Sequence, residues 1–333
     1  MQQFHIREAV VFEDILPEDA SIASDAMALT RTRMSLQQML DDPPEDASQI
    51  TRTCQEYSQA MDSMIEYVRK NRHAKLLTQP IFHWYVHGQS IQSTCWLLDS
   101  VMTKHVIATA FENEAMETLK EDVKAASKLF GKSAEMRQCA IDVLSMWTWC
   151  SPSHELLHKK WHQARREFCL LNHQLATLDV GISKCISPTV LFTVSQRAIR
   201  HAMQSLDAWP TDESLAALHV AESMRYLYSS NILWTEEKYG HSIYRMQRWL
   251  GHKLNGEPYT HIQQQLESVP FLLDERLRDN QTVYFHKVVA STPLAEPVDL
   301  MYNTTDIAHP ACLEDEQEQD ATHEANTDAA MLE

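Results

Sequence analysis

Residues 168–182 read Phe-Cys-Leu-Leu-Asn-His-Gln-Leu-Ala-Thr-Leu-Asp-Val-Gly-Ile, and this stretch decides the fold class. Its apolar residues recur at spacings of three and four, namely Phe168, Leu171, Leu175, Leu178 and Ile182. Residues at these spacings lie on one face of an α-helix. The helical pattern extends over residues 153–186 and ends at Ser187-Pro188, because proline removes a backbone donor. The stretch therefore predicts a long helix with an apolar stripe.

Similar helical patterns cover most of the chain on either side. They span residues 47–68, 91–111, 113–149, 189–206, 213–254 and 259–278. Only 6 glycines occur in 333 residues, and good helix formers dominate throughout. Long helices joined by short breaks are typical of a helical-hairpin array of the tetratricopeptide kind, although no 34-residue consensus recurs. We therefore predict a mainly α fold built as a solenoid-like helical array.

Three segments break the helical pattern. The N-terminal residues 4–12 and residues 81–86 are rich in aromatic and β-branched side chains. The third segment, residues 279–289, reads Asp-Asn-Gln-Thr-Val-Tyr-Phe-His-Lys-Val-Val. We expect a small β element formed by the N-terminal segment and residues 281–289, with residues 81–86 as a further extended piece.

Charge divides the chain into two parts. The formal net charge is −17, yet residues 288–333 hold eleven Asp or Glu and no Lys or Arg. Removing that segment leaves −17 + 11 = −6 for residues 1–287, an ordinary value. We predict a single helical domain over residues 1–305, followed by an acidic, disordered tail over residues 306–333. Nucleic acid is not an expected partner, because phosphate binding needs clustered cations.

The sequence favours a cytoplasmic location. No apolar stretch reaches the roughly 18 to 20 residues that a membrane helix needs, and the N-terminus lacks a secretory apolar region. The 7 cysteines are an odd number without Cys-x-x-Cys spacing. Reduced, mostly buried thiols are therefore expected.

Three histidines raise the alternative of a helical metalloprotein. His154, His158 and His162 are spaced by four, and residues 155–158 form one Glu-x-x-His motif. A di-iron site needs a second such motif on a partner helix, which the sequence lacks. There is also no Gly-x-Ser-x-Gly elbow, phosphate loop or dinucleotide fingerprint. We expect a non-enzymatic protein without a cofactor.

The apolar stripe remains as the candidate site. Cys169 and Leu170 widen it beyond one helical face. Plain core packing explains such a stripe, but a stripe this wide can also pack inward on one side and leave a groove for a partner helix. Gly181 within it permits close approach of another backbone.

The order of these segments resembles the Bro-one domain of the Alix, Brox and rhophilin group of ESCRT-associated scaffolds. The segments that carry the resemblance, in chain order, are residues 53–62, 96–110, 119–130, 162–171, 217–254 and 278–288. The last has the aspartate-asparagine, aromatic, basic and valine signature with which the family's domain closes. The likeness covers about residues 1–300 and rests on collinearity, since no single motif is unique.

The resemblance implies a curved helical body that binds the amphipathic C-terminal helix of a Snf-type ESCRT-III subunit in endosomal, multivesicular-body sorting. By the same resemblance, Phe168, Cys169 or Leu170, and Ile182 fall on the family's apolar contacts. Leu171, Leu175 and Leu178 complete the predicted partner-binding set. Attachment to endosomal membranes would then come through the partner.

Two features depart from the family pattern. The chain has no prenylation cysteine at its last residues, and Cys169 offers less bulk than the aromatic side chain usual in the family's patch. A rhophilin-like signalling scaffold that binds a small GTPase or another protein is therefore kept as the alternative function.

Overall fold

The computed structural model describes residues 4–7, 10–15, 23–42, 47–70, 78–86, 88–146, 154–249 and 259–288. All of them belong to one compact unit, Met1–Leu294. The predicted domain boundary at residue 305 and the acidic tail lie outside the described residues, so both stay predictions.

The N-terminal part combines two helices with a small sheet. The strands β1 (Phe4–Ile6), β2 (Phe82–Val86) and β3 (Gln89–Ser93) form an antiparallel sheet in the order β1-β2-β3. Helix α1 (Ala23–Asp41) packs on β1, and α2 (Ala47–Lys70) packs on α1. The amphipathic helix predicted over residues 47–68 is confirmed, and its apolar face is buried at Cys54, Tyr57 and Met61.

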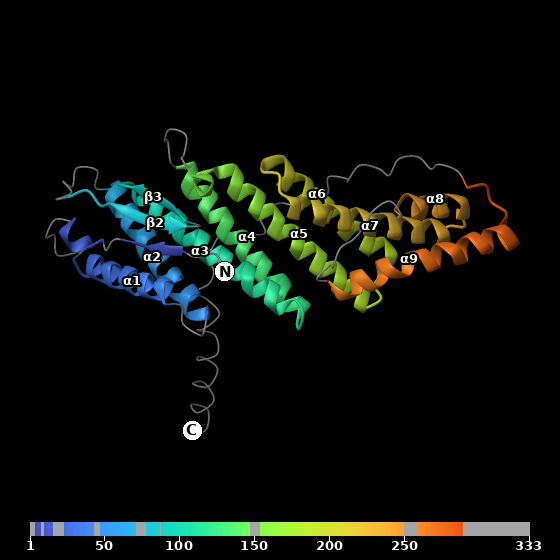
Figure 1. Ribbon diagram of the computed structural model, residues 1–333, viewed down its shortest axis with the longest axis horizontal. Coiled ribbons are helices and arrows are strands. Elements are labelled where there is room, and N and C mark those ends of the chain that lie inside the picture. Colours follow the sequence, from blue (N-terminus) through green and yellow to red (C-terminus); the bar gives the residue numbers. More distant parts are fainter. Residues whose placement is uncertain are drawn as a thin grey trace, which may run out of the picture. The chain divides into compact units, whose positions relative to one another are not determined.

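The central part is a series of helices in which each packs on the next (Figure 1). They are α3 (Trp96–Thr118), α4 (Val123–Ser145), α5 (Lys159–Ser183), α6 (Pro188–Ala208) and α7 (Asp212–Thr235). Local sequence sets their starts. The Asp122 carboxylate accepts the Ala125 N–H at 3.0 Å, Pro188 occupies the first turn of α6, and the Thr211 hydroxyl accepts the Ser214 N–H at 3.1 Å. The prediction of a mainly α fold with a small β element is confirmed.

The helix predicted over residues 213–254 is divided in two. After α7 the chain turns at Glu237, which has a left-handed backbone (φ 60°), and continues as α8 (Tyr239–Trp249). Helix α9 (Thr260–Asp279) then packs on this hairpin. Arg276 of α9 donates to the hydroxyls of Ser230 and Ser242 at 2.7 and 3.0 Å, so it joins all three helices.

The strand predicted at residues 281–289 is wrong as far as residue 288. The chain instead forms a π-helical turn, η3 (Asn280–Tyr284), which ends at Phe285 in the left-handed region (φ 54°). The Asn280 side chain makes hydrogen bonds that a neighbouring strand would otherwise make. Its amide N–H donates to the His286 carbonyl oxygen at 2.8 Å, and its amide oxygen accepts the His286 N–H at 3.0 Å. Tyr284 stacks on Tyr239 with ring centroids 3.7 Å apart. The third strand of the sheet is β3, so the helix predicted over residues 91–111 is wrong at residues 91–93. Ile91 is the one apolar residue of this strand, which explains why its residues did not show a strand pattern.

Two large hydrophobic clusters lie within these layers. The first joins the sheet to α1, α2 and α3, and contains Phe12, Tyr57, Phe82 and Trp84. The second joins the end of α3 to α4 through α9, and contains Leu171, Leu175 and Leu178 of α5.

Gly240 lies in close contact with the backbone of Lys287 and Val288. A Cβ built on Gly240 would lie 2.1 Å from the Lys287 carbonyl oxygen, which is a backbone atom and cannot move alone. We expect Gly240→Ala to separate this segment from α8 and to lower the free energy of unfolding by about 1–3 kcal/mol, as overpacking does. Chemical denaturation checks this.

Gly131 of α4 is the matched control, since a Cβ there would meet nothing within 4 Å. Gly131→Ala is expected to raise the free energy of unfolding by about 0.5–1 kcal/mol, the helix-propensity gain. Equal effects of the two substitutions would contradict the close contact at Gly240.

Candidate partner-binding surface

Helix α5 carries all seven residues of the predicted stripe, but most of them are core. Cys169, Leu171, Leu175 and Leu178 are buried, with exposed fractions of 1%, 0%, 1% and 0%. For these residues the prediction of an accessible groove is wrong. The reason is that α5 packs against α4 on one side and α6 on another, and also contacts α9.

The start of α9 covers the face of α5 that contains Leu175. The buried Asp179 carboxylate of α5 accepts the backbone N–H groups of His261 and Ile262 at 2.8 and 2.9 Å. It therefore caps the first turn of another helix and places a negative charge at that helix's N-terminus. Tyr259 adds a hydrogen bond to the Asn172 carbonyl oxygen at 3.1 Å. The sequence feature that pointed to this contact is Asp179, an acidic residue inside the apolar stripe.

The remaining three residues are partly exposed and lie on different sides of α5. Phe168 and Ile182 pack against the second hydrophobic cluster, and the Arg165 guanidinium lies 4.8 Å from the Phe168 ring centroid. Leu170 follows Phe168 by two residues and so points about 200° away around the helix. Thr177, seven residues after Leu170, is exposed on the same side.

Beneath Phe168, a buried polar cluster joins α5 to α3 and α4. The Glu112 carboxylate accepts from Arg165 at 2.6 Å, from Arg137 at 3.1 Å and from the Cys169 thiol at 3.0 Å. Burial and the nearby Glu112 charge raise the pKa of Cys169, so the thiol stays protonated. Cys169 thus acts as a hydrogen-bond donor inside the fold, and not as a contact for a partner.

Comparisons with known proteins agree with this helix order. No protein-family model and no curated protein matches the sequence. Among solved structures, a Bro1 domain studied for endosomal targeting aligns with a TM-score of 0.67 and 16% identity, covering 88% of each chain. The BRO1 domain of ALIX in complex with CHMP4C aligns with a TM-score of 0.70 and 14% identity, covering 89% of this chain and 95% of that one. This chain has the Bro1-domain fold. ALIX in complex with a SIVmac239 late domain also aligns, at a TM-score of 0.70 and 14% identity, but this chain spans only 49% of that longer ALIX chain.

None of the described helices of this Bro1 fold is both long enough and apolar enough to span a bilayer.

The three histidines do not line one helix of the Bro1 fold. His154 precedes the short 3₁₀ helix η2 (Glu155–Leu157), where its Nδ1 accepts the Leu156 N–H at 3.2 Å, and His158 lies just before α5. His162 is buried and bonds the Leu156 carbonyl oxygen at 2.8 Å. Burial and then Arg137 lower the pKa of His162 to about 3. Within the described ranges, no group of three or more His, Cys, Asp or Glu side chains is placed to hold a metal ion.

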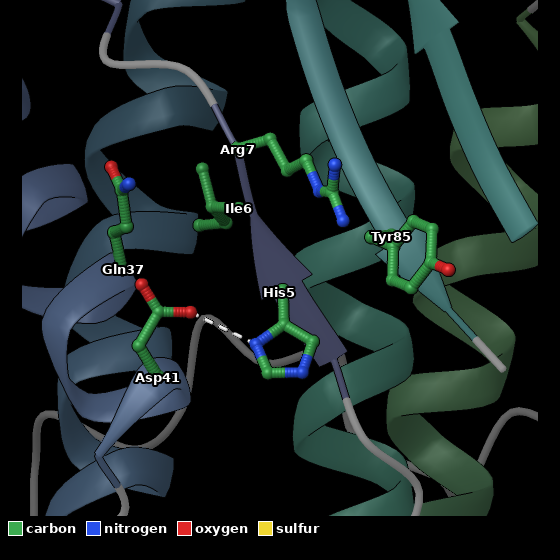
Figure 2. A pocket seen from close by; sticks show the side chains of 6 residues that line it. All are labelled: His5, Ile6, Arg7, Gln37, Asp41 and Tyr85. Carbon is green, nitrogen blue, oxygen red and sulfur yellow. Dashed lines mark hydrogen bonds and ion pairs between the residues drawn. The ribbon is translucent and has the colours of Figure 1, made fainter. Parts of the chain in front are cut away.

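The Bro1 fold also has an open pocket of about 370 Å³ between β1, α1 and β2. Figure 2 shows the His5 ring facing Asp41, with Nδ1 and Oδ1 2.9 Å apart. The Arg7 guanidinium lies 4.6 Å from the centroid of the Tyr85 ring. Ligand pockets are mainly apolar, whereas this lining is polar except for Ile6 and Tyr85. The pocket therefore ranks below α5 as a functional site.

Proposed function

We propose that this chain is a non-enzymatic adaptor that binds the C-terminal helix of an ESCRT-III subunit. The observation that carries the proposal is the similarity to the BRO1 domain in the CHMP4C complex, which extends over 95% of that domain. The packing of α5 restricts which residues a partner can contact, because only the partly exposed residues of this helix are accessible. Recruitment to endosomal membranes through the partner belongs to the same proposal.

The contact is proposed on α5 at Leu170 and Ile182. Between Phe168 and Ile182 the start of α9 is held by Asn172 and Asp179, so it covers the middle of that side of α5 but leaves Ile182, near the end of the helix, partly exposed. The side with Leu170 and Thr177 is open along the middle of the helix. An amphipathic helix binds such a surface by burying a few apolar anchors.

Titration of a fluorescent ESCRT-III C-terminal helix peptide into the purified chain tests the proposal. We expect saturable binding, weakened about tenfold or more by Leu170→Asp and by Ile182→Asp, because each introduces a charge at an apolar contact that the bound helix would bury. Circular dichroism of each variant verifies that it is folded.

Met34→Asp is the matched control. Met34 is an exposed methionine on α1, a helix that packs on α2 and β1, and this variant should bind the peptide like the wild type. Absence of binding by the wild type, or equal binding by all variants, would overturn the proposal. Recovery of a small GTPase and no ESCRT subunit in a pull-down would favour the signalling-scaffold alternative.

A further inference from the structure

Helix α8 gathers nitrogen-bearing side chains on one side. His241, Arg245 and Arg248 are separated by four and three residues, so they share one face of the helix. Arg245 is buried with an exposed fraction of 8%, whereas Arg248 is exposed. One side of α8 therefore carries two guanidinium groups and an imidazole at different depths.

Helix α7 adds a third guanidinium at the same level. The hydroxyls of Ser230 and Ser242 lie 2.8 Å apart, which fixes the register of the α7–α8 hairpin. Arg225 precedes Ser230 by five residues, about 7.5 Å along α7, and Arg245 follows Ser242 by three, about 4.5 Å along α8. In this antiparallel hairpin the two arginines thus lie within about 3 Å of the same level.

The electrostatics agree with this register. Burial lowers the pKa of Arg245 first, and Arg225 and Arg248 lower it further, whereas the phenols of Tyr226 and Tyr244 oppose that change. Arg225 and Arg248 therefore each lie close enough to Arg245 to repel it. The Arg225 guanidinium carbon lies 5.6 Å from the ring centroid of Tyr226, the next residue on α7.

Arg225 and Arg248 have no carboxylate partner among the described residues. Two nitrogen atoms, the Arg225 Nε and the His241 Nδ1, are buried and have no hydrogen-bond partner among the described residues. Glu222 precedes Arg225 by three residues on α7 but forms no ion pair with it there. Clustered guanidinium groups that repel one another are stabilised when an anion binds between them.

We propose that Arg225, Arg245 and Arg248 form a binding site for a phosphate monoester, with Tyr226, Tyr244 and His241 as neighbouring hydrogen-bonding groups. Guanidinium forks match phosphate oxygens in pairs, and a monoester carries close to two negative charges at neutral pH. The phosphate can belong to a lipid headgroup or to a free phosphorylated compound.

Calorimetric titration of inositol trisphosphate into the full 333-residue chain at low salt tests the site. We expect saturable binding that weakens as salt increases. Arg248→Gln and Arg225→Gln should each weaken it about tenfold, since each removes charge-assisted hydrogen bonds. Arg278→Gln on α9 is the control: it removes the same charge at an exposed position outside the cluster and should leave binding unchanged.

Sedimentation with phosphatidylcholine vesicles, with and without a phosphatidylinositol phosphate, then distinguishes the sources. Retention only by the phosphorylated vesicles, reversed by inositol trisphosphate, identifies a lipid headgroup. Saturable calorimetric binding without retention identifies a free phosphorylated compound. Absence of saturable binding, an equal loss in Arg278→Gln, or equal retention by phosphatidylserine vesicles would overturn the proposal.

Discussion

Replacing Glu112 by glutamine is expected to lower the free energy of unfolding by about 3–5 kcal/mol, the usual cost of breaking a buried ion pair from one side. The Glu112 carboxylate faces two guanidinium groups, at 3.1 Å from Arg137 and 2.6 Å from Arg165. Arg137 is only 1% exposed, so water cannot replace the lost charge. Glutamine preserves the shape but leaves two cations facing a neutral amide. Urea denaturation monitored by circular dichroism measures the change.

The pH dependence of stability gives a second readout for Glu112. Burial opposes ionisation most strongly, but Arg137 and Arg165 together lower the pKa of Glu112 from 4.5 to about 2. The unfolded chain therefore takes up this proton first as the pH falls. The stabilisation is complete above about pH 4.5 and is lost as the pH falls toward about 2, by about 1.4 kcal/mol per unit. The wild type should lose about 3 kcal/mol more than Glu112→Gln over that range.

Glu213→Gln is the control for this cluster. Glu213 pairs with the same Arg165 at 2.8 Å, but its side chain is 65% exposed. Its loss should cost less than about 1 kcal/mol, as for surface ion pairs. If Glu112→Gln costs no more than Glu213→Gln, the buried cluster does not hold α3, α4 and α5 together as the geometry indicates.

The helical content was predictable because local signals set it. Spacings of three and four identified α2, and the helix predicted over residues 189–206 matches both ends of α6 to within two residues. The break between α7 and α8 has no such signal. Residues 236–238 are Glu-Glu-Lys, with neither glycine nor proline, and Glu237 takes up the left-handed turn instead.

The site was less predictable because its exposure depends on contacts distant in sequence. Periodicity placed Leu175 on an apolar face, but whether that face is open depends on Asp179 and on His261, which lies 82 residues further along the chain. The prediction of a strand over residues 281–289 was wrong for a related reason. Its aromatic and β-branched residues favour a strand, yet no described strand pairs with it, and Asn280 satisfies the backbone locally.

A comparably large loss of stability is expected for Asp99→Asn, about 3–5 kcal/mol. Asp99 is fully buried, and its carboxylate accepts from Arg33 Nε at 3.0 Å and also from the Tyr57 hydroxyl and the Trp84 indole N–H. These donors come from α1, α2 and β2, so one carboxylate on α3 joins every layer of the N-terminal part. An amide in its place removes the charge that faces the 1%-exposed Arg33.

Asp62→Asn is the control, because it removes a carboxylate that pairs with a buried cation but is not itself buried. Asp62 pairs with the buried Lys104 at 2.8 Å, but its own side chain is 49% exposed, so water can solvate the lysine after the change. Denaturation should therefore show a loss several-fold larger for Asp99→Asn than for Asp62→Asn. In the double variant Arg33→Met/Asp99→Asn the loss should fall short of the sum of the single losses by about 1 kcal/mol or more, because the unbalanced cation is removed too. Additive losses would mean that Asp99 stabilises the layers through its neutral donors alone.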